Sequence, residues 1–233
     1  MNVEIWSDIV CPWCYIGKRR FEAALARFEH AGEVRITWRS FQLDPSSPGR
    51  YPGSLDEMLA RKLGRTVPEA RAMNARVTEL AADEGLDYRL DVARPGNTFD
   101  AHRALHLAAS KGLAAQAKER LLRAYFTEGA EISDVDVLAG LLAEVGVDEG
   151  EARAALSGDA FAEGVRADVA RARALGLSGV PFFVFEERYG VSGAQSPDFF
   201  LEVLRKVRAE VGPTAVAEGG ACAADACDLP DAG

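Results

Sequence analysis

The periodicity of hydrophobic and polar positions changes along this chain. Residues 3–7 are a short β-prone run, and from residue 12 to about 29 apolar side chains recur at helical spacing. Residues 33–43 instead alternate apolar with polar side chains, which predicts a strand with one covered face. We therefore expect a strand, a helix that Gly32 terminates, and a second strand.

A long block with helical periodicity follows a stretch rich in Pro, Gly and Ser at residues 44–53. The block extends from residue 54 to about 177, and a longer irregular stretch at 87–97 interrupts it. The expected helices cover residues 55–63, 68–84, 98–110, 113–126, 135–145, 149–156 and 160–175.

Strand character returns at residues 180–193, which predict two strands joined by a tight polar turn near 186–188. A helix should come next, with Ser196 as its cap, Pro197 at its first position and Gly212 after its end. The remaining residues are rich in Ala, Gly and Asp and lack periodicity, so they predict a flexible tail.

The order of these elements predicts an α/β unit that a helical block interrupts. Residues 1–52 and 178–212 should form one discontinuous domain, residues 53–177 an all-helical insertion, and residues 213–233 the tail.

Net charge and hydropathy exclude some classes of partner. Across 233 residues, 27 Lys and Arg oppose 36 Asp and Glu, and the net charge of -9 disfavours nucleic acid. The chain begins without a basic, apolar signal segment, and no apolar stretch approaches the roughly 18 residues that span a bilayer. We expect a cytoplasmic protein without a membrane partner.

The motif Cys11-Pro12-Trp13-Cys14 stands where the first helix should begin. Pro12 suits the first helical position, and the helix dipole favours a thiolate at Cys11, which predicts an exposed nucleophile of low pKa. Cys14, one turn deeper, is placed to attack a mixed disulfide formed at Cys11. In a reducing compartment this spacing favours redox chemistry.

A zinc site is the main alternative for these cysteines, and it would need two further ligands. His30, His102 and His106 are not usefully paired with the motif, so we expect no metal. Cys222 and Cys227 could contribute only if the tail folds back. That second pair is either a redox shuttle for the first pair or an inert, disulfide-closed segment.

The chain resembles thioredoxin-fold proteins of the DsbA type in three features. They are the Cys-Pro-Trp-Cys motif after a first strand, the helical insertion, and the Gly-Val-Pro before a third strand. The resemblance covers residues 1–212. "SDIVCPWCYIG", "NTFDAHR" and "GVPFFVF" with "YGVSGAQSPDFF" resemble more narrowly the FrnE subgroup of disulfide oxidoreductases. Relatives of that subgroup are 2-hydroxychromene-2-carboxylate isomerases and kappa-class glutathione transferases, which commonly carry serine where this chain has Cys11.

The resemblance implies a cis bond before Pro181, with Pro181 facing Cys11 and the Val180 backbone pairing with a substrate. It also implies that the segment with Asn97 and Asp100 lines the cleft, although ordinary helix packing explains both residues as well.

Three further residues have two readings each. The relatives imply that Ser196 and Asp198 contact a thiol cofactor, whereas helix capping explains both equally well. Related folds hold an acid beneath the active site, so Glu4 is a candidate proton acceptor, with a salt-bridged Glu4 as the alternative.

These observations predict a thiol–disulfide oxidoreductase or isomerase acting on protein or small-molecule disulfides, with Pro12 and Trp13 contacting the substrate. One alternative is an isomerase or transferase of small aromatic or polyketide-like substrates that depends on a glutathione-like thiol. Another is a non-catalytic redox sensor or metal-binding module. We expect no bound cofactor, a low-molecular-weight thiol as an optional co-substrate, and a monomer or weak homodimer.

Overall fold

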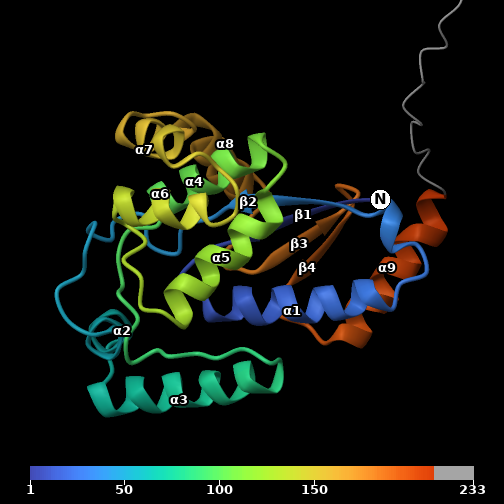
Figure 1. The fold of residues 1–233 in the computed structure, drawn as a ribbon. Coiled ribbons are helices and arrows are strands. Elements are labelled where there is room, and N and C mark those ends of the chain that lie inside the picture. Colours follow the sequence, from blue (N-terminus) through green and yellow to red (C-terminus); the bar gives the residue numbers. More distant parts are fainter. Residues whose placement is uncertain (213–233) are drawn as a thin grey trace, which may run out of the picture.

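The computed structural model describes residues 1–212, and both ends of that range contribute to one sheet. The strands are β1 (Asn2–Ser7), β2 (Arg35–Ser40), β3 (Phe182–Phe185) and β4 (Tyr189–Ser192). Their order is β2-β1-β3-β4, with β1 parallel to β2 and antiparallel to β3, and β3 antiparallel to β4. The predicted discontinuous α/β unit is therefore present (Figure 1).

Nine α-helices accompany the sheet within the described range. They are α1 (Pro12–Ala26), α2 (Leu55–Leu63), α3 (Val67–Asp83), α4 (Phe99–Ser110), α5 (Ala114–Phe126), α6 (Val135–Ala143), α7 (Glu149–Ser157), α8 (Ala162–Ala174) and α9 (Pro197–Val211). The seven helices α2 to α8 all lie between β2 and β3 in the sequence, which is the expected helical insertion.

The two faces of the sheet are covered by helices from different parts of the chain. On one face, Phe21 of α1, Phe183 of β3 and Phe200 of α9 form an aromatic cluster with ring centroids 4.6–5.4 Å apart. On the other face, Trp6 of β1 packs with Ala172 of α8. Because residues of β1 other than Asn2 are buried, the strand is enclosed on both sides and holds the loop before α1 in place.

The insertion shares its core with the start of α1. Tyr15 and Ile16 belong to the same apolar cluster as the buried residues of α4, α5 and α6. The ring of Tyr88 stacks on Phe126 at a centroid distance of 4.6 Å and lies 6.1 Å from the ring of Tyr15. Helix α1 therefore joins the two halves of the molecule, and the division at residues 52/53 and 177/178 stays a prediction.

Local signals predicted the helix starts to within two residues, and several starts carry the expected kind of cap. Ser54 and Thr66 form capping boxes with Glu57 and Glu69, so two backbone donors at each helix start are satisfied. Ser196 accepts a hydrogen bond from the Phe199 backbone, as expected of a cap.

Two boundaries around β2 differ from the expectation. Helix α1 ends at Ala26 rather than near residue 29, and a 3₁₀ turn at Ala31–Glu33 takes up the residues before the strand. The strand itself covers only Arg35–Ser40, and Ile36 on its expected covered face exposes 38% of its surface. Ile36 is this exposed because β2 lies at the edge of the sheet.

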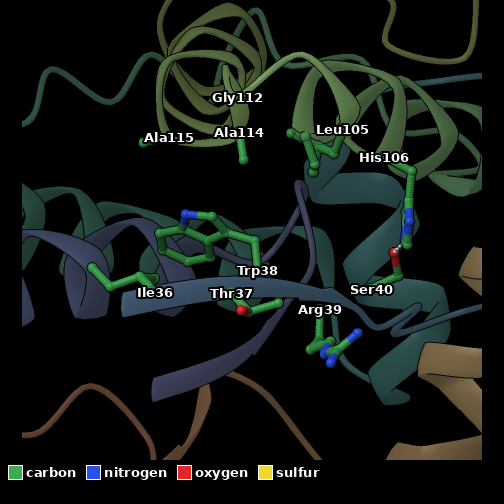
Figure 2. A pocket seen from close by; sticks show the side chains of 11 residues that line it. Ile36, Thr37, Trp38, Arg39, Ser40, Leu105, His106, Gly112, Ala114 and Ala115 are labelled. Atoms are coloured by element: carbon green, nitrogen blue, oxygen red, sulfur yellow. Dashed lines mark hydrogen bonds between the residues drawn. The ribbon is translucent and has the colours of Figure 1, made fainter. Parts of the chain in front are cut away.

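A hollow of about 410 Å³ lies beside that edge (Figure 2). Ile36, Trp38 and Ser40 form its floor, and Leu105 and His106 of α4 face them. Because this hollow separates part of β2 from α4, the apolar side chains of β2 are less buried than the alternation in residues 33–43 predicted.

Candidate active site

The Cys-Pro-Trp-Cys motif forms the first turn of α1. Cys11 is the N-cap residue with extended backbone (φ -88°, ψ 112°), and Pro12 occupies the first helical position. The backbone N–H of Cys14 donates to the carbonyl of Cys11 at 3.0 Å, which closes the turn. Both cysteines are free thiols, so the motif is in its dithiol form.

The Val180–Pro181 segment lies directly against this turn. The peptide bond is cis, as the family resemblance implies. The Cys11 thiol donates to the Val180 carbonyl oxygen with an Sγ–O distance of 3.4 Å. A Cβ added at Gly17 would lie 2.9 Å from Cγ of Pro181, so the glycine is what permits this close approach.

Both cysteines are buried, in contrast with the exposed nucleophile of low pKa expected at Cys11. Cys11 exposes 3% of its surface and Cys14 2%. Hydrogen bonding with Cys14, followed by burial, raises the pKa of Cys11 well above its ordinary value. The expectation was wrong because it considered the helix N-terminus and not the neighbouring sulfur and the loss of water.

The lowered pKa is that of Cys14. Burial opposes the shift, but the contact with Cys11, the positive charge of Lys118 on α5, and hydrogen bonding with Ser7 and the Asp8 backbone lower the pKa. The two thiols are coupled, and the surroundings of Cys14 include more groups that favour a thiolate than those of Cys11.

Asp8, in the loop between β1 and α1, holds a buried carboxylate beside the motif. Its two oxygens accept hydrogen bonds from the backbone N–H groups of Ile9 and Leu43, each at 2.8 Å. Burial would raise the pKa of Asp8, but hydrogen bonding and charge from His102, with the Leu43 N–H, lower it. The carboxylate is thus kept ionised within a few residues of Cys11.

His102 of α4 completes this cluster from the helical insertion. Its Nε2 lies 3.3 Å from Oδ1 of Asp8 and 3.0 Å from the carbonyl oxygen of Phe41. Both neighbours are acceptors, so Nε2 carries a proton. His102 of the "NTFDAHR" segment therefore contacts the Asp8 carboxylate, while the lining of the cleft by Asn97 and Asp100 of that segment stays a prediction.

Tyr88 is a second contribution of the insertion, from the irregular stretch at 87–97. Its hydroxyl donates to the carbonyl of Pro12 at 2.6 Å, which fixes the peptide between the two cysteines. Burial, and then the neighbouring Cys11 and Cys14, raise the pKa of Tyr88, so it remains a donor. A lone tyrosine in an irregular segment gave no signal of this role.

The other residues proposed from that segment are occupied elsewhere. The amide of Asn97 donates to the Ser47 carbonyl at 2.9 Å and accepts from the Phe99 N–H at 2.8 Å. Asp100 accepts from Arg103 at 2.7 Å. Both organise the start of α4, and their substrate contacts stay a prediction.

Glu4, Ser196 and Asp198 also have structural partners. Glu4 is ion-paired with Arg39 and Arg171 at 2.6 Å each, which matches the salt-bridged alternative. Ser196 caps α9, and Asp198 forms an exposed ion pair with Arg27 at 2.7 Å. The acid that the structure places beside the cysteines is Asp8 rather than Glu4.

Trp13 stands out beside the buried thiols because it exposes 42% of its surface, while Pro12 is half-buried. The exposed indole is an apolar surface within the motif, and the substrate contacts of Pro12 and Trp13 stay a prediction. Cys222 and Cys227 lie outside the described residues.

The hollow beside β2 is separate from the motif, since neither cysteine lines it. At its edge, Nε2 of His106 lies 3.1 Å from the Ser40 hydroxyl and 3.1 Å from Oδ2 of Asp168 (Figure 2). Ser40 and Asp168 contact the same ring nitrogen of His106, so the imidazole cannot pass a proton from one to the other.

Within residues 1–212, no helix is long and apolar enough to cross a membrane.

Comparison with known proteins agrees with this arrangement. A family model described as "DSBA-like thioredoxin domain" matches residues 2–205. A crystal structure described as a "probable DsbA oxidoreductase" from Streptomyces coelicolor is 41% identical, covers 99% of this chain and 100% of its own, and has a TM-score of 0.87.

Two more distant structures share the fold. The cytosolic disulfide reductase DsbM from Pseudomonas aeruginosa with GSH is 21% identical, with a TM-score of 0.62 over 88% of this chain and 98% of its own. A 2-hydroxychromene-2-carboxylate isomerase is 19% identical, with a TM-score of 0.66 over 90% and 98%.

The fold and the paired thiols define a thiol–disulfide oxidoreductase of the thioredoxin class. Within that class, this chain belongs to the DsbA-like thioredoxin-domain family. Its membership of the FrnE subgroup stays a prediction.

Proposed function

We propose that this protein exchanges disulfides with protein or small-molecule substrates through Cys11 and Cys14. The observation that carries the proposal is the enclosure of two free thiols between the first turn of α1 and the Val180–Pro181 segment, with Cys11 Sγ 3.4 Å from the Val180 carbonyl. Cys11 is the N-cap residue at the open end of α1 whereas Cys14 lies inside the first turn, so an incoming sulfur meets Cys11 before Cys14.

The exchange has two balanced steps. Cys11, once its proton has passed to Cys14, attacks a substrate disulfide as a thiolate, forms a mixed disulfide and displaces one substrate thiolate. Cys14 gives that proton to the displaced thiolate and then attacks Cys11 Sγ as a thiolate, and the second substrate thiolate leaves as the Cys11–Cys14 disulfide forms. Two electrons pass from the protein to the substrate, and the same steps in reverse oxidise a substrate dithiol.

The return of the protein to its starting state needs a thiol or disulfide from outside the chain. We propose that a low-molecular-weight thiol of the glutathione type fills this role as a co-substrate rather than as a bound cofactor. Having sulfur at both positions supports exchange over the thiol-dependent isomerase alternative, whose relatives commonly have serine at the Cys11 position.

Insulin reduction with glutathione as the electron source tests the proposal. Cys11→Ser should abolish turnover, because no mixed disulfide can form. Cys14→Ser should stop after the first step and accumulate a mixed disulfide with the substrate, which intact-protein mass spectrometry detects.

The matched control is the rate at which glutathione alone reduces insulin, and circular dichroism checks that each variant is folded. A Cys11→Ser protein that reduces insulin at the wild-type rate would place the chemistry elsewhere. A Cys14→Ser protein without a trapped adduct would remove Cys14 from the resolving role.

A further inference from the structure

Arg20 of α1 joins three parts of the chain around the cysteine motif. Its Nε donates to Oε1 of Glu84, at the C-terminal end of α3, at 2.6 Å. Its Nη1 donates to the carbonyl oxygen of Ala194, in the loop between β4 and α9, at 2.7 Å. The ion pair is largely enclosed, since 22% of the Arg20 side chain and 19% of the Glu84 side chain are exposed. The guanidinium therefore ties the helical insertion to a loop of the thioredoxin-like part.

The loop that Arg20 contacts also holds the Val180–Pro181 segment. The backbone N–H of Gly193 donates to the carbonyl of Pro181 at 2.9 Å. On the other side of the segment, the carbonyl of Val180 accepts from the Cys11 thiol at 3.4 Å. Ala194 directly follows Gly193, so the bond from Arg20 fixes the loop one residue from the donor that Pro181 receives.

Helix α1 contacts the same region at Gly17. A Cβ added there would lie 2.9 Å from Cγ of Pro181 and 3.3 Å from Cβ of Ala194. Gly17 and Arg20 are three residues apart in the helix and so lie on one face of it. That face leaves room for Pro181 at Gly17 and fixes Ala194 through Arg20. The helix that carries Cys11 thus also determines where the segment lies.

Glu84 has no stabilising role in its own helix. A carboxylate at the C-terminal end of α3 meets the negative end of the helix dipole, which disfavours it. The guanidinium of Arg20 offsets this cost. Because its donors point in fixed directions within one plane, the contact of Nε with Glu84 orients Nη1 toward Ala194.

We propose that Arg20 is a positioning residue for disulfide exchange. It holds the loop at Ala194, and through that loop the Val180–Pro181 segment, in place against Cys11, and Glu84 of the insertion orients it. This rests on the redox function proposed above and adds a residue outside the motif on which exchange with a protein substrate depends. A polypeptide disulfide has to reach Cys11 past this segment, whereas a small reagent needs only the sulfur.

Two rates measured on the full-length reduced protein test the proposal. They are kcat/KM for insulin reduction and the rate of Cys11 alkylation by iodoacetamide, followed by peptide mass spectrometry. In Arg20→Met the insulin value should fall at least about tenfold, because small displacements near reacting groups have effects of this order. Alkylation should be as fast as in wild type or faster, because a segment that moves away uncovers the thiol.

Arg20→Lys is the conservative variant. It keeps a positive charge beside Glu84 but lacks the planar set of donors that also reaches Ala194. It should therefore recover only part of the insulin activity that Arg20→Met loses.

Arg208→Met is the matched control. Arg208 of α9 forms a similarly enclosed ion pair with Glu33 at 3.0 Å, with 14% and 26% of the side chains exposed. Glu33 lies in the turn before β2, so this pair joins other parts of the chain. Arg208→Met should lower the melting temperature but leave both rates within about twofold of wild type.

Hydrogen exchange at the Gly193 amide, followed by NMR, reports on the loop without any turnover. This N–H is bound to the Pro181 carbonyl, so its exchange slows as long as the loop stays in place. It should become at least about tenfold faster in Arg20→Met and stay unchanged in Arg208→Met.

Wild-type insulin reduction in Arg20→Met overturns the proposal, as does unchanged exchange at Gly193 or an equal loss of insulin activity in Arg208→Met. If Arg20→Met does not fold, wild-type insulin reduction in Arg20→Lys overturns it. If the wild-type protein itself does not reduce insulin, the proposed function fails, and exchange at Gly193 still decides whether Arg20 holds the loop. The two failures are therefore distinct.

Discussion

The sheet and the helical insertion contact the cysteine motif from two sides and with different kinds of groups. The sheet side presents backbone, namely the Val180 carbonyl at 3.4 Å from Cys11 and the cis bond next to it. The insertion presents side chains, including the Tyr88 hydroxyl on Pro12 and the charge of Lys118 near Cys14. The sheet side thus contacts the motif through backbone, and the helical insertion contributes polar and charged side chains around it.

The largest effect should come from Asp8→Asn, at the junction of the two sides. Asn has one acceptor oxygen, and its NH₂ group would meet a backbone N–H that Asp8 now accepts. We expect a loss of about 3 kcal/mol in the free energy of unfolding at neutral pH, measured by urea denaturation. Asp198→Asn, in an exposed ion pair, should cost less than about 0.5 kcal/mol.

The same variant should change the acid limb of the stability curve. The folded-state pKa of Asp8 is lowered, so its stabilisation is present above the unfolded pKa of about 3.9 and is lost as pH falls through the folded value. The difference between wild type and Asp8→Asn should therefore shrink below about pH 4. A difference that grows on acidification would contradict the assignment.

The second prediction acts on the sheet side through Gly17→Ala. The new methyl would approach Cγ of Pro181 to 2.9 Å and Cβ of Ala194 to 3.3 Å. Although alanine favours helix by up to about 1 kcal/mol, overpacking of about 1–3 kcal/mol should outweigh it by about 1 kcal/mol net. The insulin assay should show a larger fractional loss than the stability measurement, because the displaced segment faces Cys11.

Gly140→Ala in α6 is the control, since nothing lies within 4 Å of its added Cβ. It should raise stability by about 0.5–1 kcal/mol and leave the insulin assay unchanged. Equal behaviour of the two variants would mean that Gly17 does not serve the approach of Pro181.

The smallest effect belongs to Tyr88→Phe on the insertion side. The ring keeps its stacking on Phe126, and only the hydrogen bond to Pro12 is lost, at about 1 kcal/mol. Thermal unfolding of the reduced protein measures it. Tyr189→Phe removes an exposed contact with Glu210 and should have a smaller effect. A larger loss of stability in Tyr189→Phe than in Tyr88→Phe would mean that the Tyr88 hydroxyl does not stabilise the motif.

The helices and strands could be predicted well, because caps and periodicity are set by residues that are neighbours in the sequence. Ser54 and Thr66 are caps that a reader of the sequence can recognise from the Glu three positions on, and Ser196 from the Pro197 that follows it. The motif at Cys11 and the cis bond before Pro181 were likewise identifiable, the second through family resemblance rather than from spacing.

The electrostatics of the site could not be predicted in the same way. Lys118 is one of several cations on an amphipathic helix, and only tertiary packing reveals that it is enclosed while its neighbours are not. Asp8 and Glu4 are both acids near β1, and the sequence could not tell which faces Arg39 and which faces the cysteines. Ile36 looked covered because alternation does not indicate which strand is the edge.

The central position of β1 constrains when the protein can fold during synthesis. One neighbour, β2, belongs to the same opening unit, but the other, β3, emerges only after the entire helical insertion. Until residues 182–185 leave the ribosome, β1 has an unpaired edge and Phe21 lacks the rings of Phe183 and Phe200. Nascent chains that stop before residue 178 should therefore be sensitive to protease in residues 1–40, and those that continue through α9 should become resistant.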